Sequence, residues 1–253
     1  MLQTALSQRD VAVLTTLREF RLGTIAQLHL MHFHGHASPA TAKRVTRRVM
    51  TRLMRHGLVD RLERRIGGVR AGSAGFIFRL SPVGYRVVGD QTRKRRWEPT
   101  AHHVHHTLAI TELAAQMFER SRVSGWAVEK MQAEPMCWRS FGAVNQSLLK
   151  PDLHLVVAND DFELSWFVEI DLATESGTVL TRKLTTYSQY WRSGEEEANS
   201  GVFPRVLWIA PDKTRADFIE RVIRSDRAIE PGLFMVTTTE VALDVLTDFG
   251  DTQ

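Results

Sequence analysis

The sequence of 253 residues contains a single cysteine, Cys137. One cysteine excludes an internal disulfide bond and any zinc site built from several cysteines. The chain also lacks a Gly-x-x-x-x-Gly-Lys phosphate loop, which argues against a nucleoside triphosphatase. No apolar run approaches the roughly 20 residues that a helix needs to cross a bilayer, and residues 1–4 do not begin a signal-peptide core. We therefore expect a cytoplasmic protein with no membrane partner.

Acidic residues are scarce in the first 100 residues, which hold 6 Asp and Glu against 19 Lys and Arg, a net charge of +13. Residues 101–253 hold 23 acidic against 14 basic residues, a net charge of −9. The length suggests two domains, and the asymmetry predicts a basic domain that binds double-stranded DNA, joined to an acidic second domain. We place the first domain at residues 1–92, a basic linker at 93–100 and the second domain at 101–253.

Three short helices are predicted at the start of the chain. Ser7 and Thr24 each precede a polar residue three positions on, as in a capping box, and Ser38-Pro39 opens a third helix that Gly57 ends. The first helix is expected to bury Val11, Leu14, Leu17 and Phe20. Residues 58–66 and 76–80 alternate as two strands around a glycine-rich tip. Three helices followed by a hairpin is the order of a winged helix-turn-helix domain.

The third helix carries no acidic residue between positions 41 and 56. Its apolar residues Ala42, Val45, Val49 and Leu53 recur at helical spacing, and the basic residues fall on the opposite side. A solvated basic face is the alternative, but solvated helices usually mix charges of both signs. We therefore predict a DNA-recognition helix lying in the major groove. The predicted DNA contacts are Lys43, Arg44, Arg47, Arg48, Arg52 and Arg55 on the helix and Arg64, Arg65 and Arg70 on the hairpin.

Carboxylates mark both ends of a second predicted hairpin. Residues 153–157 and 164–170 are apolar runs separated by a turn-like segment, with Asp152 before the first run and Glu169 and Asp171 at the end of the second. In an antiparallel pair these ends lie side by side, so the three carboxylates can converge. Oxygen ligands of this kind suit a magnesium ion, although carboxylates at strand ends also serve as turn residues and helix caps. Asp152, Glu169 and Asp171 are our predicted metal ligands.

The rest of the second half alternates between strands and helices. This pattern predicts an α+β or α/β architecture in which helices flank a mixed sheet. We expect an irregular connection at residues 132–147 and an exposed acidic loop at residues 194–197.

Pro151-Asp152 followed by Glu169-x-Asp171 resembles the PD-(D/E)xK nuclease superfamily, whose pattern is Pro-Asp, a gap and then acid-x-Lys. Asp171 stands where that pattern has lysine. Lys183 follows one element later, and Lys183-x-x-x-Tyr187 lies where some branches carry a polar-x-x-x-Tyr motif on a helix. With its basic winged-helix-like front, the chain resembles the bacterial plasmid replication-relaxation family over roughly residues 8–245. This resemblance implies a nuclease-like second domain.

Two functions follow from these patterns. The first is a DNA-binding protein of a plasmid or other mobile element that acts in replication or DNA processing. Its second domain would be a magnesium-dependent DNA endonuclease with Asp152, Glu169, Asp171 and Lys183 as catalytic residues. The second is a non-catalytic DNA-binding regulator whose degenerate nuclease-like domain mediates homodimer formation or partner binding. Asp171 in the lysine position favours this second function.

Overall fold

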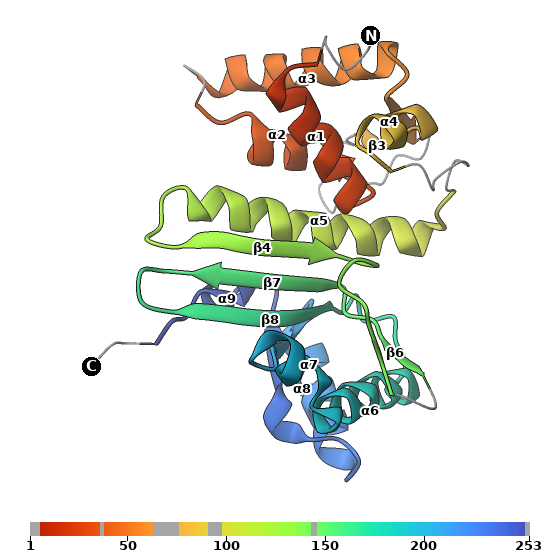
Figure 1. The fold of residues 1–253 in the computed structure, drawn as a ribbon, viewed down its shortest axis with the longest axis vertical. Coiled ribbons are helices and arrows are strands. Elements are labelled where there is room, and N and C mark those ends of the chain that lie inside the picture. The colour runs from red at the N-terminus through yellow and green to blue at the C-terminus, as the bar shows by residue number, and fades with distance from the viewer. Residues whose placement is uncertain (1–5, 36–37, 63–75, 91–97, 143–145, 251–253) are drawn as a thin grey trace. The chain divides into compact units, whose positions relative to one another are not determined.

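The computed structural model describes residues 6–35, 38–62, 76–90, 98–142 and 146–250 (Figure 1). The chain divides into two compact units, Met1–Arg120 and Ser121–Gln253. Both α-helices and a mixed β-sheet are present, so the protein is α+β. None of the helices among the described residues is both long enough and apolar enough to cross a membrane.

The first unit is mainly helical. Its helices are α1 (Gln8–Glu19), α2 (Ile25–His32), α3 (Pro39–Arg55), α4 (Pro82–Val87) and α5 (Ala101–Ser121), and its strands are β1 (Gly23–Thr24), β2 (Val59–Leu62) and β3 (Ile77–Leu80). The strands form an antiparallel sheet in the order β1-β3-β2.

The predicted helix starts in this unit are confirmed. Ser7 and Thr24 each form a capping box, and Ser38 accepts a hydrogen bond from the Thr41 backbone at the start of α3. Gly57 follows α3 with a φ of +66°, a conformation that glycine adopts without steric cost. The helices therefore begin at short polar side chains that cap them, and α3 ends next to a glycine.

The core of the first unit joins α1, α2 and α3 to the small sheet. Leu14, Leu17, Leu28 and Leu53 are fully buried in it. The expectation that Val11 is buried is wrong, because its side chain is 45% exposed. The buried face of α1 instead includes Val13, which is fully buried next to Leu14.

Most of α5 belongs to the first unit, whereas the sequence predicts that the second domain starts at residue 101. The Gln27 side chain donates to the Leu108 carbonyl oxygen and to the Glu112 carboxylate, at 3.0 and 2.9 Å. The buried Thr111 hydroxyl donates to the Leu22 carbonyl oxygen at 2.9 Å. These long-range bonds satisfy buried polar groups and hold α5 against the helices at the start of the chain.

The second unit is built on a five-stranded mixed sheet. The strands of this unit are β4 (Ala127–Ala133), β5 (Arg139–Phe141), β6 (Ser147–Leu149), β7 (Leu153–Ala158), β8 (Glu163–Ile170), β9 (Arg205–Ala210) and β10 (Phe234–Thr238). Its helices are α6 (Gly177–Ser193), α7 (Glu195–Ser200), α8 (Lys213–Ser225) and α9 (Ala242–Leu246), with a 3₁₀ turn at Pro231–Leu233. The sheet order is β10-β9-β8-β7-β4, in which β8, β9 and β10 are parallel and β7 is antiparallel to β8 and β4.

The predicted hairpin is present as β7 and β8, but part of the connection before it, predicted to be irregular at residues 132–147, is regular. Strands β5 and β6 pair with each other there, in an antiparallel sheet of their own. Phe141 of β5 and Leu149 of β6 are buried in the main core of this unit. Two three-residue strands are too short to show a clear alternation of apolar and polar residues, which explains why the sequence pattern missed them.

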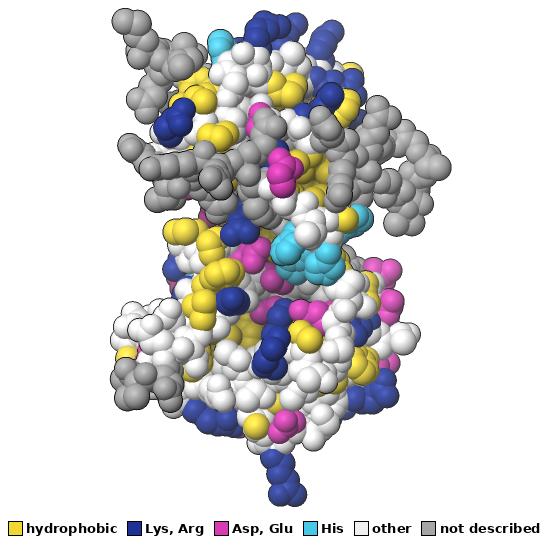
Figure 2. Space-filling model, turned by 90° about the vertical axis from the view of Figure 1, so that its right-hand side faces the viewer, with side chains coloured by type: hydrophobic (Ala, Val, Ile, Leu, Met, Phe, Trp, Pro, Cys, Tyr) yellow, Lys and Arg dark blue, Asp and Glu magenta, His cyan; other side chains and the backbone are white. Residues whose placement is uncertain are grey.

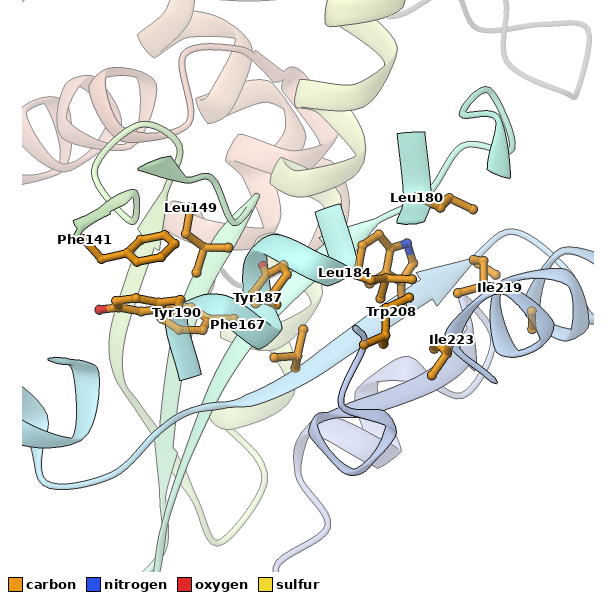
Figure 3. Packing of buried hydrophobic residues seen from close by; sticks show 14 residues of the cluster. Phe141, Leu149, Phe167, Leu180, Leu184, Tyr187, Tyr190, Trp208, Ile219 and Ile223 are labelled. Carbon is orange, nitrogen blue, oxygen red and sulfur yellow. The ribbon is translucent and has the colours of Figure 1, made fainter. Parts of the chain in front are cut away.

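Helices α6 and α8 contribute to the core that lies against one face of the sheet (Figure 3). Tyr187 of α6 lies between two aromatic side chains of the sheet, with ring centroids 6.2 Å from Phe167 and 6.3 Å from Trp208. Ile219 of α8 is fully buried in the same cluster. This packing fixes the position of α6 against β8 and β9.

The predicted acidic loop at residues 194–197 is wrong, because Glu195–Ser200 forms helix α7 and Glu196 is buried. The Glu196 carboxylate accepts hydrogen bonds from the Tyr190 hydroxyl and, at 2.9 Å, from Arg139 Nε. Arg139 also donates to His154 Nδ1 at 3.1 Å. A buried carboxylate is stable only when it is paired and hydrogen-bonded, and Arg139 and Tyr190 supply these partners.

Candidate functional sites: a basic helix face and a carboxylate cluster

The basic side chains of α3 lie on its exposed side. Lys43, Arg44, Arg47 and Arg48 are all exposed and have no acidic partner among the described residues. Lys and Arg side chains gather at the end of the first unit that carries α3 (Figure 2). The opposite side of α3 contributes Val49, Met50 and Leu53 to the core. The helix therefore presents a row of positive charge while its apolar side anchors it.

Arg52 differs from the other arginines of α3. Its guanidinium forms an ion pair with Asp10, whose side chain is 1% exposed, while the Arg52 side chain remains 46% exposed. Burial opposes ionisation of Asp10, but hydrogen bonds from Ser7 and the charge of Arg52 outweigh it and lower the pKa of this carboxyl group. Arg52 thus links α3 to the start of α1.

The hairpin arginines Arg64, Arg65 and Arg70 lie outside the described residues, as does the basic run at residues 93–96. Their predicted DNA contacts stay predictions.

Asp152 and Glu169 lie opposite each other on neighbouring strands. The β7–β8 register pairs Leu153 with Val168, which puts the preceding Asp152 beside the following Glu169. The Asp152 backbone donates to the Val168 carbonyl oxygen at 3.2 Å, and Ile170 N–H donates to Asp152 Oδ2 at 2.8 Å. Both carboxylates are buried, at 5% and 1% exposure. The structure thus brings two of the three predicted metal ligands together.

Helix α6 adds two side chains to this pair. The Tyr187 hydroxyl donates to Glu169 Oε1 at 2.7 Å, and Lys183 Nζ donates to Glu169 Oε2 at 3.2 Å. Lys183 Nζ also lies 2.9 Å from Glu175 Oε1. Residues 183 and 187 are one helical turn apart, so both side chains point from the same side of α6. Asp152, Glu169, Lys183 and Tyr187 are called the carboxylate cluster below.

The Asp171 side chain makes its hydrogen bonds with Arg215 and Ala173, which do not belong to the carboxylate cluster. Its carboxylate accepts two hydrogen bonds from Arg215, at 2.8 Å from Nε and 2.7 Å from Nη2, and a third from the Ala173 backbone at 2.5 Å. Its side chain is completely buried. Arg215 also donates to the Glu175 carbonyl oxygen at 2.8 Å. Asp171 therefore joins the end of β8 to the first turn of α8 through a two-pronged ion pair.

Sequence reasoning missed Arg215, because nothing near Asp171 in the sequence points to a residue 44 positions later. The pattern that could have suggested it is Asp212 at the start of α8, whose side chain caps the helix at the Arg215 backbone. That cap fixes where α8 begins and so places Arg215 in its first turn.

The electrostatics of the carboxylate cluster are those of a crowded buried site. Burial raises the pKa of Glu169 to about 7; Lys183 opposes this rise, and the Asp152 carboxylate adds to it. Burial would lower the pKa of Lys183, but Glu169, Asp152 and Glu175 outweigh it and raise that pKa well above its ordinary value. Burial and the Glu169 carboxylate raise the pKa of Tyr187, which stays protonated and donates its hydrogen bond. Because its pKa is raised, the Lys183 ammonium keeps its positive charge at neutral pH.

These contacts do not fit a resident magnesium ion. Among the residues that the structure describes, no three acidic, histidine or cysteine side chains are grouped so that they could hold a metal. Asp171 is bound to Arg215, and both oxygens of Glu169 already accept hydrogen bonds. Magnesium prefers six oxygen ligands in near-octahedral geometry, and an ammonium group next to Glu169 repels it. The predicted three-carboxylate set is therefore not assembled in this structure.

A family model described as Replication-relaxation matches residues 14–206. The match covers more than half of the chain and spans both units. The chain belongs to the replication-relaxation family. Membership connects this replication-relaxation protein with plasmid replication and DNA processing. No curated protein and no solved structure matches the chain.

Proposed function

We propose that this replication-relaxation protein binds double-stranded DNA through α3, the recognition helix of a winged helix domain. The observation that carries the proposal is the exposed side of α3, where Lys43, Arg44, Arg47 and Arg48 have no acidic partner among the described residues. Because charged side chains on solvated helices usually include both signs, a row of one sign suits a partner of the opposite sign. Duplex DNA, with one negative charge per roughly 1.7 Å of its axis, is such a partner.

The order of elements in the first unit supports the winged-helix assignment. Helices α1, α2 and α3 are followed by β2 and β3, and β1 joins these strands in a three-stranded sheet. In helix-turn-helix proteins the recognition helix enters the major groove, where arginine side chains reach guanine edges and phosphates. Replication and DNA processing, the context that the family supplies, both require a protein that holds DNA.

For the second unit we propose a non-catalytic role in homodimer formation or partner binding. The support is the pairing of its acids: Arg215 neutralises Asp171, and Lys183 and Tyr187 hold Glu169. The alternative function, a magnesium-dependent endonuclease, is favoured by the position of Asp152 opposite Glu169 with Lys183 close by. It stays a prediction. Nicking of supercoiled plasmid in magnesium or manganese, lost in Asp152→Asn, would establish it.

The DNA proposal is tested with Arg47→Ala/Arg48→Ala in the full chain. Binding to a labelled duplex is followed by fluorescence anisotropy at several salt concentrations. Each lost phosphate or base contact is worth about 1–3 kcal/mol, so affinity should fall at least tenfold and the salt dependence should become shallower. The matched control is Arg221→Ala/Arg224→Ala, which removes two exposed arginines from α8. Equal affinities of the α3 variant and the wild type would refute α3 as the DNA-binding element.

A further inference from the structure

The carboxylate cluster already contains a cation of its own. Lys183 Nζ lies 3.2 Å from Glu169 Oε2 and 2.9 Å from Glu175 Oε1, and its side chain is only 33% exposed. Asp152, directly opposite Glu169, also acts electrostatically on Lys183. The positive charge thus lies beside Glu169, one member of a pair of strand-end carboxylates that would otherwise repel each other.

We propose that the Lys183 ammonium is the built-in counter-ion of the Asp152–Glu169 pair and fills the place that a divalent cation would need. Removing this ammonium should therefore convert the pair into a site for a divalent cation. The inference concerns the second unit alone and does not depend on whether α3 binds DNA.

The position of Lys183 is set by the core around it. Leu180 and Leu184, on either side of it in the same helix, are fully buried, as is Tyr187 one turn later. The Lys183 ammonium also lies 5.9 Å from the centre of the Trp208 ring, on the strand next to β8. Because α6 cannot shift without disturbing this packing, the packing holds the Lys183 ammonium next to Glu169.

A divalent cation would have to displace this arrangement before it could bind. It would need oxygen atoms of Glu169 that now accept hydrogen bonds from Lys183 and Tyr187, and it would be repelled by the ammonium. Without the ammonium, two buried carboxylates on one sheet face remain, and the hydrogen bonds that they accept from the Tyr187 hydroxyl and from Ile170 N–H bring no positive charge to offset their repulsion. Hard oxygen ligands in that state suit magnesium or manganese.

The test compares the full-length wild type with Lys183→Met, which removes the charge and keeps most of the apolar stem, and Lys183→Arg, which keeps a charge. Melting temperatures are measured in EDTA and in 10 mM manganese or magnesium chloride at matched ionic strength. We expect the wild type and Lys183→Arg to shift by less than about 1 °C. Lys183→Met should gain about 3–5 °C, the effect of an ion present at roughly ten times its dissociation constant.

Two further variants locate the effect. Glu175→Gln removes the second partner of Lys183 but leaves the ammonium beside Glu169, so its melting temperature should respond to metal as weakly as that of the wild type. Asp152→Asn/Lys183→Met removes a carboxylate of the pair and should lose the gain seen in Lys183→Met. A gain that survives this double substitution would place the ion elsewhere and overturn the proposal.

A second readout covers the case in which Lys183→Met does not fold in EDTA. Circular dichroism then shows whether manganese restores the folded signal, and the electron paramagnetic resonance of free manganese reports the ions bound. Restoration with about one ion per chain supports the proposal, and failure of manganese to restore the fold counts against it. A wild type that gains as much from metal as Lys183→Met also overturns it. DNA binding by the wild type, measured in EDTA, is read separately and stands or falls with α3.

Discussion

Helix α3 and the carboxylate cluster use charge in opposite ways. The basic residues Lys43, Arg44, Arg47 and Arg48 are exposed on α3, without acidic partners among the described residues. Asp152 and Glu169 are buried, and Glu169 is compensated by groups of the chain itself. Exposed charges of one sign cost little to keep in water, whereas buried charges are tolerated only with partners. The first arrangement is therefore free to bind an external partner, and the second is part of the folded structure.

This difference predicts opposite results from substitutions in the two regions. Removing an exposed α3 arginine should weaken DNA binding and leave stability almost unchanged. Removing a partner of a buried carboxylate should unfold the second unit more easily.

The largest effect is expected for Arg215→Met. This substitution leaves the Asp171 carboxylate, whose side chain is completely buried, without its ion-pair partner. Breaking a buried pair from one side typically costs about 3–5 kcal/mol of unfolding free energy. Urea denaturation followed by circular dichroism measures the loss.

A double variant, Asp171→Asn/Arg215→Met, is the control for this prediction. It removes the uncompensated charge as well and should recover part of the stability lost in Arg215→Met. A single variant as stable as the wild type would show that Asp171 finds another partner, and the contrast between the two regions would weaken.

The next effect concerns pH. Burial, with the charges of Lys130 and Arg139, lowers the pKa of His154 from 6.5 to about 4. Arg139 donates to His154 Nδ1, which must therefore be unprotonated, and Nε2 lies 3.2 Å from Ser165 Oγ. Because the unfolded chain binds this proton more readily, His154 stabilises the fold fully above pH 6.5. That stabilisation is lost as the pH falls toward 4, by about 3 kcal/mol in total.

Denaturation midpoints at several pH values, in the wild type and in His154→Gln, isolate this contribution. Glutamine keeps an acceptor for Arg139 but does not titrate. The difference in unfolding free energy between the two proteins should shrink as the pH falls from 6.5 to 4. Parallel pH profiles would mean that the pKa of His154 is the same in the folded and the unfolded chain.

Local patterns of the sequence predicted much of this fold. Ser7, Thr24 and Ser38 marked helix starts because a cap involves residues only three positions apart. The β7–β8 hairpin followed from two apolar runs and a turn, and its register brought Asp152 beside Glu169. Each of these features depends on neighbours in the chain or on a tight turn.

Several of the features that were missed depend on distant partners. Asp171 was expected beside a metal, but its position is determined by Arg215, which belongs to another helix. The acidic run at residues 194–197 predicts an exposed Glu196, but Glu196 pairs with Arg139, which is 57 positions away in the sequence. The first compact unit extends to Arg120, and Gln27 bonds with Glu112 on α5, 85 positions away in the sequence. Periodicity along the chain carries no information about such pairs.

The smallest effect separates Arg52 from its neighbours on α3. Arg52 pairs with Asp10 across the first unit, whereas Arg48 has no acidic partner among the described residues. Since the Arg52 side chain is 46% exposed, its ion pair should contribute only about 0.2–1 kcal/mol, and Arg48→Ala should change stability less still. Arg52→Ala should therefore lower the urea midpoint slightly more than Arg48→Ala does, while Arg48→Ala should weaken DNA binding more.

The lowered pKa of Asp10 adds a pH test, because the ion pair between Arg52 and Asp10 is present above the ordinary pKa of an aspartate and is lost as Asp10 protonates in acid. The stability difference between Arg52→Ala and the wild type should accordingly vanish in acid, and a difference that persists there would assign the role of Arg52 to packing of its stem instead of its charge.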